Sequence, residues 1–239
     1  MIIGLRNGFV FICMPKCASN SVEEMLGPWS DWAIVQQPPL RHLTYRQYNT
    51  YLKPLLDDVY DTVDLQTVCL MREPVSWLYS WYRFGSRQQL QNPSHPNHAH
   101  STAHLGFDEF VEGYIAPERA AFAENIPRQC DFVCDEDGNL KVDHLFKYEE
   151  ISTLVRHFEK LLGAELQLGH LNVSPQVHAR GPVRAFAFRA YNAVRRRFFK
   201  RASSEQFLKA KRPPPELSPD LTARLKRHLA RDFELYAGL

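Results

Sequence analysis

Continuous hydrophobic runs, each followed by a stretch with helical periodicity, dominate the first third of the chain. The runs at 8–14 and 64–71 have the length and composition of buried strands. The stretches at 20–27 and 75–84 carry apolar residues at helical spacing, and Pro74 suits the first turn of the second helix. Because strands that alternate with helices usually lie parallel in one sheet, this pattern predicts an α/β fold with a central parallel sheet flanked by helices.

The second half of the chain predicts a hairpin and further helices. Gly138 lies between two alternating apolar runs within 132–148, which favours a β-hairpin. Residues 149–162 have a helical pattern that ends at Gly163, a residue typical of helix C-termini. A last amphipathic helix is predicted over 218–236.

Two irregular segments separate these elements. Residues 28–41 are rich in tryptophan and proline, and we interpret them as an irregular loop over a cleft, followed by a helix with Thr44 as its N-cap. Residues 86–106 contain four histidines among Gln, Asn, Pro and Ser, which indicates a flexible excursion. A metal site in this excursion is an open alternative, but solvated histidines are favoured because nothing fixes a ligand geometry.

The composition fits one globular domain over 1–239. Of its 239 residues, 44% are hydrophobic and 12% aromatic, which is enough for a core and excludes global disorder. No apolar run approaches the ~18 residues typical of a membrane-spanning helix. The first apolar run is too short for a signal peptide, so we expect a cytoplasmic protein.

Five cysteines are distributed along the chain. Cys13 and Cys69 lie in the predicted strands, where reduced, buried thiols are expected. Cys130 and Cys134 have no histidine pair at zinc-site spacing beside them, so we predict no metal site there.

The segment 15–21 follows the first predicted strand and leads into the first predicted helix. Backbone N–H groups at such a loop and at a helix N-terminus are unpaired and favour anions. Lys16 adds a full positive charge, and the small side chains at 17–19 let an oxyanion approach the backbone. We therefore predict a phosphate or sulfate site, in preference to an exposed loop lysine. The segment differs from the ATP/GTP P-loop, because both glycines of Gly-x-x-x-x-Gly-Lys-[Ser/Thr] are absent and the lysine precedes the small residues.

Arg72 follows the second predicted strand directly. On the helix after it, Ser76 and Ser80 share a face with Arg72 if the arginine lies just before the helix. A bidentate guanidinium and a hydroxyl together suit a second phosphate. The alternative is a structural ion pair between Arg72 and a carboxylate such as Glu73.

Several blocks of the sequence together resemble the sulfotransferases that use 3′-phosphoadenosine 5′-phosphosulfate (PAPS), most closely the carbohydrate-type branch with bacterial members. The blocks are 15–21 (the 5′-phosphosulfate loop), 68–82 (the 3′-phosphate segment, with its Arg and Ser eight residues apart), 132–149 (a hairpin and a Tyr-Glu turn), and 171–174 with 232–236 (the C-terminal blocks). The resemblance implies a P-loop-like sheet and an activity that uses PAPS as co-substrate and needs no metal.

The resemblance also implies roles for individual residues. Lys16 would stabilise charge on the leaving phosphate, and Arg72 with Ser80 would hold the 3′-phosphate. His42 follows the first helix, where related carbohydrate enzymes place a general base; a loop histidine hydrogen-bonded near a helix start is the alternative. The 5′-phosphate and sulfuryl oxygens would be bound by Cys17, Ala18, Ser19, Asn20 and Ser21.

One position in the loop departs from the family. The family often has Gly-Thr-Ser or Ser-Thr-Ser where this chain has Ser19-Asn20-Ser21. The amide of Asn20 still donates a hydrogen bond, so nucleotide binding remains the expectation. The neighbouring Glu23 and Glu24 are expected to form a solvated helix face.

Charge is unevenly distributed along the chain. Residues 1–179 hold 14 Lys and Arg against 22 Asp and Glu, whereas residues 180–239 hold 15 against 5. The basic excess centres on 180–215, where aromatic residues at helical spacing predict a basic helical extension before the last helix. This stretch is either solvated charge, a lid over the nucleotide, or a contact for an anionic acceptor. A further alternative is that residues 180–212 contact an anionic membrane surface. The acidic first part argues against a nucleic-acid partner.

The function implied by the resemblance is transfer of a sulfuryl group to a hydroxyl, or to an amine, of a carbohydrate or glycolipid-like acceptor by in-line displacement. A kinase-like nucleotide enzyme is one alternative, although the missing Gly-Lys-[Ser/Thr] argues against it. A non-catalytic anion-binding module for a membrane surface or nucleic acid is the other. The membrane alternative implies a protein that is peripheral to the membrane.

Overall fold

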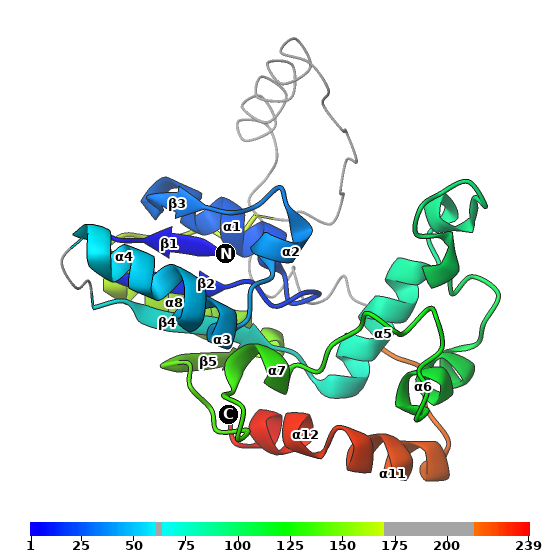
Figure 1. Cartoon of the computed structure of the whole chain (residues 1–239). Coiled ribbons are helices and arrows are strands. Elements are labelled where there is room, and N and C mark those ends of the chain that lie inside the picture. Colours follow the sequence, from blue (N-terminus) through cyan, green and yellow to red (C-terminus); the bar gives the residue numbers. More distant parts are fainter. Residues whose placement is uncertain (61–63, 170–212) are drawn as a thin grey trace.

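A mixed sheet lies at the centre of the computed structural model, which describes residues 1–60, 64–169 and 213–239 (Figure 1). The sheet has five strands in the order β3-β1-β2-β4-β5. In the view of Figure 1, helices cover the sheet in front and behind, so the chain has the α/β class that the sequence predicts. The strands are β1 (Ile2–Gly4), β2 (Phe9–Ile12), β3 (Trp32–Ala33), β4 (Gln66–Met71) and β5 (His144–Lys147).

The three strands β2, β4 and β5 form the parallel half of the sheet. Phe11 of β2 pairs with Val68 of β4, and Val68 pairs in turn with His144 of β5. All of β2 and most of β4 are buried, which explains why both strands are continuous hydrophobic runs in the sequence. Parallel pairing places the carboxyl ends of β2 and β4 at the same edge of the sheet, where ligands of open α/β sheets bind.

The other half of the sheet is antiparallel, so the prediction of a parallel sheet is only partly right. β1 pairs antiparallel with both β2 and β3. Residues 2–12 thus form a hairpin, with Gly8 at the positive φ of 69° that its turn requires. The hydrophobic pattern did not show β1, because a strand of three residues is too short to display a period.

The helices begin and end close to the predicted positions. Pro74 lies in the first turn of α5, Thr44 caps α3 with a capping box, and Gly163 ends α8 at a φ of 62°. The helical elements are α1 (Ser19–Leu26), η1 (Gly27–Trp29), α2 (Pro38–Arg41), α3 (Tyr45–Gln47), η2 (Tyr48–Leu52), α4 (Lys53–Tyr60), α5 (Pro74–Gly85), η3 (Gln88–Gln91), η4 (His98–His100), α6 (Phe107–Ile115), α7 (Cys130–Val133), η5 (Tyr148–Glu150), α8 (Ile151–Leu162), α11 (Pro219–His228) and α12 (Ala230–Ala237).

The core forms where these helices meet the sheet. On one face, Phe158 of α8 packs edge-on against Phe9 and Phe11 of β2, with ring centroids 5.2 and 6.5 Å apart. Beyond the sheet edge, α5 and α6 pack together, and α11 and α12 run beneath them (Figure 1). Trp77 of α5 and Tyr114 of α6 are fully buried in this second helical layer.

The predicted β-hairpin over 132–148 is wrong. Its first part belongs to the helix α7, and a single bridge between Cys134 and Leu140 is all that remains of the pairing. The carboxylate of Asp135 accepts hydrogen bonds from the backbone N–H groups of Asp137 (3.1 Å) and Asn139 (2.8 Å). These bonds form a closed turn that needs no flanking strands, and the chain then continues into β5, which pairs with β4 instead.

The end of the chain also differs in detail from the prediction. The last helix begins as expected, because the Ser218 hydroxyl accepts a hydrogen bond from the N–H of Leu221. It is divided at Leu229 into α11 and α12, whereas the pattern predicts one helix. Residues 28–41 include the short elements β3 and α2 and are therefore less irregular than predicted. The basic stretch 180–212 lies outside the described residues.

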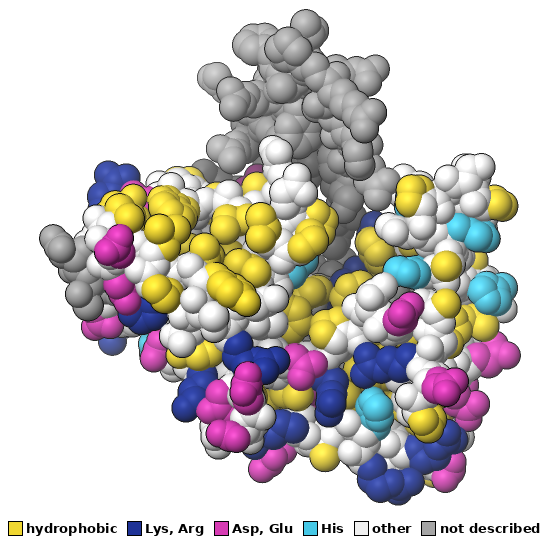
Figure 2. All heavy atoms as spheres, in the orientation of Figure 1, with side chains coloured by type: hydrophobic (Ala, Val, Ile, Leu, Met, Phe, Trp, Pro, Cys, Tyr) yellow, Lys and Arg dark blue, Asp and Glu magenta, His cyan; other side chains and the backbone are white. Residues whose placement is uncertain are grey.

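All five cysteines are buried free thiols, as predicted for Cys13 and Cys69. Burial raises the pKa of Cys13 to about 12, so this thiol stays protonated and unreactive at neutral pH. Among the described residues, no helix is both long enough and apolar enough to cross a membrane. Figure 2 shows apolar side chains gathered over the surface of α2 to α4. The exposed ones there include Val35, Leu40, Tyr51, Leu55, Val59 and Tyr60.

Candidate functional site

The loop between β2 and α1 has an unusual backbone conformation. Lys16 and Ala18 have positive φ angles of 65° and 58°. Non-glycine residues in this region cost about 1–2 kcal/mol each, so surrounding contacts must hold the loop. Two contacts do so: the Ser19 hydroxyl donates to the carbonyl of Met14, and the indole of Trp77 donates to the carbonyl of Pro15, both at 2.9 Å. Strain that is maintained in this way is typical of ligand-binding loops.

The N-terminus of α1 is not capped by any side chain. Its N-cap is Ala18, which has no side-chain acceptor, and its first turn holds no acidic residue. The N-terminus of α5 differs, because the Glu73 carboxylate accepts hydrogen bonds from the N–H groups of Val75 (3.1 Å) and Ser76 (2.7 Å). Of these two helix starts, α1 is therefore the one that can offer its N–H groups and its positive dipole end to an anion.

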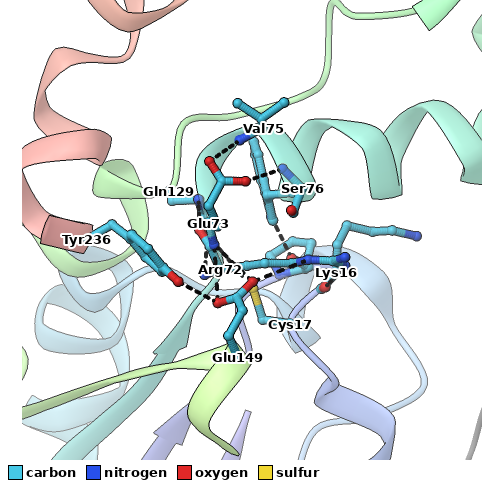
Figure 3. A network of polar contacts seen from close by, with 11 residues as sticks. Lys16, Cys17, Arg72, Glu73, Val75, Ser76, Gln129, Glu149 and Tyr236 are labelled. Carbon is cyan, nitrogen blue, oxygen red and sulfur yellow. Dashed lines mark hydrogen bonds and ion pairs between the residues drawn. The ribbon is translucent and has the colours of Figure 1, made fainter. Parts of the chain in front are cut away.

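The Lys16 side chain extends alongside α5 (Figure 3). Its ammonium nitrogen lies 4.1 Å from the ring centroid of Phe84 and 5.3 Å from that of Trp81. Both distances are within the range of cation–π attraction. These rings hold a positive charge beside the second half of α5.

Arg72 lies at the carboxyl end of β4 and meets the Lys16 loop. Its backbone is held on both sides by the buried amide of Gln129, which accepts from the Arg72 N–H (2.9 Å) and donates to the Arg72 carbonyl (2.8 Å). Its side chain is only 8% exposed. The guanidinium donates to the Lys16 carbonyl at 3.5 Å and lies over the ring of Tyr148, 4.7 Å from the centroid. The two predicted anion-binding motifs thus converge (Figure 3).

The Nε atom of Arg72 lacks a normal hydrogen bond. It is buried without a hydrogen-bond partner among the described residues, and the nearest carboxylate oxygen, Oε1 of Glu149, is 4.0 Å away. Glu149 itself accepts from the backbone N–H of Glu73 (3.3 Å) and from the hydroxyl of Tyr236 (2.9 Å). The ion pair predicted as an alternative role for Arg72 is therefore present but long, and it is formed with Glu149.

Residues of α12 bind the residues that hold Arg72. Asp232 of α12 is fully buried, and its carboxylate accepts from the N–H groups of Gln129 (3.1 Å) and Cys130 (2.8 Å). Burial raises the pKa of Asp232, while the two hydrogen bonds oppose the shift. Arg72 is thus connected to α12 by two routes, one through Gln129 and Asp232 and one through Glu149 and Tyr236.

On the other side of the loop, Asn20 and Glu23 bind a common arginine. Arg41 donates to the Glu23 carboxylate at 2.7 and 2.6 Å, and its second terminal nitrogen also contacts the amide oxygen of Asn20. The Glu23 side chain is only 10% exposed, so its predicted place on a solvated helix face is wrong. Because its oxygen binds Arg41, Asn20 presents its amide nitrogen as the group that can donate to a ligand.

His42 lies near the same loop. Its Nδ1 is 2.6 Å from the carbonyl oxygen of Cys13, which can only accept, so Nδ1 carries the proton and Nε2 the lone pair. Burial lowers the pKa of His42 to about 4, and the charges of Arg41 and Lys16 lower it further against the opposing effect of the hydrogen bond. The imidazole is therefore neutral at pH 7. The contact with Cys13 is the structural bond that the alternative interpretation expects, and it leaves one ring nitrogen for a proton.

The other predicted site residues occupy three different settings. Cys17 is buried, its sulfur is 3.8 Å from the amide oxygen of Gln129, and burial raises its pKa, so its side chain supports the loop from inside. Ser21 is buried in the first turn of α1, and its N–H donates to the Ala18 carbonyl at 2.9 Å. Ser80 is half-buried on α5, two turns after Arg72.

Comparison of the chain with protein-family models, curated proteins and solved structures gave no match. The site itself contains residues that the sequence patterns did not mark as functional, namely Gln129, Glu149, Asp232 and Tyr236. Glu149, Asp232 and Tyr236 lie in the blocks 132–149 and 232–236 that resemble sulfotransferases, but these blocks gave the three residues no role. Their connection to Arg72 is visible only in the folded chain.

Proposed function

We propose that this protein is a sulfotransferase that transfers a sulfuryl group from PAPS to a hydroxyl of a carbohydrate or glycolipid acceptor. The observation that carries the proposal is the meeting of two cationic anion-binding elements, since the buried guanidinium of Arg72 lies within 3.5 Å of the carbonyl of Lys16. A nucleotide phosphorylated at both its 3′ and 5′ positions needs two such elements. The same proposal includes that the central sheet is related to the sheet of P-loop proteins.

The residues present fit this nucleotide. The Nε of Arg72 is a buried donor with no hydrogen-bond partner among the described residues, and burial of an unsatisfied donor costs about 1–3 kcal/mol. A phosphate oxygen at Arg72 would satisfy this donor and form a charge-assisted, bidentate contact. The α1 N-terminus, without a capping side chain, offers its backbone N–H groups to the 5′-phosphate.

Each residue then has a defined task. Lys16 and the α1 N-terminus bind the 5′-phosphate end, with Ser19, Asn20 and the backbone of the loop around it. Arg72 and Ser80 bind the 3′-phosphate. The nucleotide supplies the sulfuryl group when it is bound.

The reaction is an in-line displacement at sulfur. The acceptor oxygen forms a bond to sulfur while the bond between sulfur and the 5′-phosphate oxygen breaks, which gives a sulfate ester and 3′-phosphoadenosine 5′-phosphate. Lys16 stabilises the charge that develops on the departing phosphate oxygen. The proton of the acceptor hydroxyl passes to a base, and the neutral His42 offers the lone pair on Nε2 for this role, as a weak base because its pKa is lowered to about 4.

A thermal-shift measurement tests the proposal. At a concentration of 3′-phosphoadenosine 5′-phosphate about 100 times its Kd, binding adds about 2.7 kcal/mol of stability. Since about 1 kcal/mol moves the Tm of a domain of this size by about 2–4 °C, we expect an increase of about 5–11 °C. Lys16→Ala and Arg72→Met should each reduce the increase to about 3.5 °C or less, because a lost buried charge contact costs about 2–5 kcal/mol.

Two control variants make the test specific. Lys53 forms an ion pair with Asp57 on α4, and Arg83 is exposed on α5, so Lys53→Ala and Arg83→Met should keep the full increase. Circular dichroism of each variant without ligand shows whether it is folded. No increase in Tm with the wild-type protein at millimolar nucleotide would refute the proposal, and a larger increase with magnesium and ATP would favour a kinase-like enzyme.

A further inference from the structure

A cavity lies beside the rings of Trp81 and Phe84 at the end of α5. It has a volume of about 120 Å³ and lies between the end of α5, the segment 86–102 and the residues around 122–126. Since one water needs only about 10–15 Å³ of a volume measured in this way, the cavity has room for several waters, which suits a single ring-sized group. Trp81 and Phe84, the two rings that lie under the Lys16 ammonium, also form part of its wall. The cavity and the Lys16 ammonium thus have these two rings in common.

The chemistry of the wall is that of a site for a polar ring. Aromatic rings of the wall, such as Phe122, offer apolar faces, while Gln89, Asn97 and Asn125 offer amide donors and acceptors. Sugars present both kinds of surface, because their C–H faces pack on aromatic rings and their hydroxyls bond to amides. The indole N–H of Trp81 is, in addition, buried without a hydrogen-bond partner among the described residues.

Among the described residues, the wall of the cavity carries a positive charge and no negative charge. Arg87 lines the cavity, and its guanidinium carbon lies 4.7 Å from the centroid of the Phe84 ring, which places a second cation on this ring besides Lys16. The imidazoles of His95 and His100 also line it, and none of the described lining residues is Asp or Glu. A wall with the permanent cation of Arg87 and no carboxylate favours an anionic ligand.

We propose that this cavity, the acceptor pocket, binds one sugar residue that carries a carboxylate, with Arg87 as the residue that selects the acidic sugar. The proposal rests on the proposed sulfotransferase function, because it assigns the acceptor side of that same site. The carboxylate pairs with Arg87 at the outer part of the pocket. The hydroxyls contact the amides of Asn97 and Asn125.

Binding of two matched disaccharides to the full chain, saturated with 3′-phosphoadenosine 5′-phosphate, tests the proposal by calorimetry. One disaccharide contains glucuronic acid, and in the other glucose replaces the glucuronic acid, so the pair differs by a single carboxylate. We expect the acidic disaccharide to bind at least tenfold more tightly. Arg87→Gln should remove this preference, whereas Arg83→Gln, an exposed arginine one turn earlier on α5, should retain it. Asn125→Leu should weaken both disaccharides by about threefold or more.

Equal affinity for the two disaccharides, no binding of either, or a preference that survives Arg87→Gln would each overturn the proposal. The stabilisation by the nucleotide is measured on the same samples. If the nucleotide stabilises wild type and Arg87→Gln equally while the disaccharide results are negative, the assignment of the pocket is wrong and the nucleotide site stands. If the nucleotide does not stabilise the wild-type protein, the sulfotransferase function itself is wrong.

Discussion

The amide of Gln129 is the contact on which the position of Arg72 depends most directly. It is fully buried and makes two hydrogen bonds, of 2.9 and 2.8 Å, to the backbone N–H and carbonyl of Arg72. Gln129→Met keeps the length of the side chain and removes both bonds. Each buried backbone group left without a partner costs about 1–3 kcal/mol, so we expect a loss of about 2–6 kcal/mol. For a domain of this size the Tm should fall by about 4–24 °C.

A second substitution at this position separates the two hydrogen bonds. In Gln129→Glu, a protonated carboxyl reproduces both contacts, whereas an ionised carboxylate can no longer donate to the Arg72 carbonyl and is buried with its charge. The pKa of this glutamate is therefore raised in the folded state. Its stabilising contribution is present at low pH and is lost as the pH rises through the folded-state pKa, so the Tm difference from wild type should grow between pH 4 and pH 8.

Thermal unfolding followed by circular dichroism measures both effects. Gln88→Met, at an exposed glutamine of η3, is the matched control and should change the stability by less than about 0.5 kcal/mol. If Gln129→Met were as stable as Gln88→Met, or if the Tm difference of Gln129→Glu did not depend on pH, Gln129 would not hold Arg72 in the way described.

Three further predictions follow from the same site. Tyr236→Phe removes the 2.9 Å hydrogen bond to Glu149 and should cost about 0.5–1.5 kcal/mol in urea unfolding; no change would mean that the bond adds nothing. Burial raises the pKa of Asp232, so wild type should lose stability relative to Asp232→Asn as the pH rises above about 4, and a constant difference would contradict this. Because the pKa of His42 is lowered to about 4, a transfer rate that uses it as base should be flat from pH 6 to 8 and fall toward pH 4; a fall centred near pH 6.5 would exclude this His42.

The strand–loop–helix units at both proposed anion-binding elements could be predicted from the sequence. Their strands are buried on both faces and so appear as continuous hydrophobic runs, and the helices begin with local signals such as Pro74. Lys16 and Arg72 could be identified because each follows such a strand directly. These are local features, and local features are what a sequence pattern records.

The remaining parts of the fold depend on tertiary contacts. β1 and β3 are strands of three and two residues, which exist because they pair with a neighbour and not because of a period. The turn at Gly138 was correct and the run after it contains β5, but the run before it contains α7 and the two do not pair, because the Asp135 carboxylate closes the turn by itself. The sequence pattern predicted one helix over 218–236, but the observed helix is interrupted at Leu229, where the backbone leaves helical geometry.

The supporting residues of the site lie far from it in sequence. Gln129 is 57 positions from Arg72, Asp232 is 103 from Gln129, and Tyr236 is 87 from Glu149. A buried glutamine has no sequence signal that distinguishes it from an exposed one. Likewise, Glu23 was expected in solvent because its partner Arg41 is 18 positions away. Such roles arise from burial and pairing in the folded chain.

The most direct measurement of the central claim compares two nucleotides that differ by one phosphate. Calorimetry with 3′-phosphoadenosine 5′-phosphate and with 5′-AMP reports the contribution of the 3′-phosphate alone. If Arg72 binds that phosphate and Lys16 the other, Arg72→Met should lower the affinity for the doubly phosphorylated nucleotide to that for 5′-AMP and leave the affinity for 5′-AMP unchanged. Lys16→Ala should weaken both nucleotides. If the wild-type protein bound both nucleotides equally, or if Arg72→Met weakened both to the same degree, the assignment of the two phosphates would be wrong.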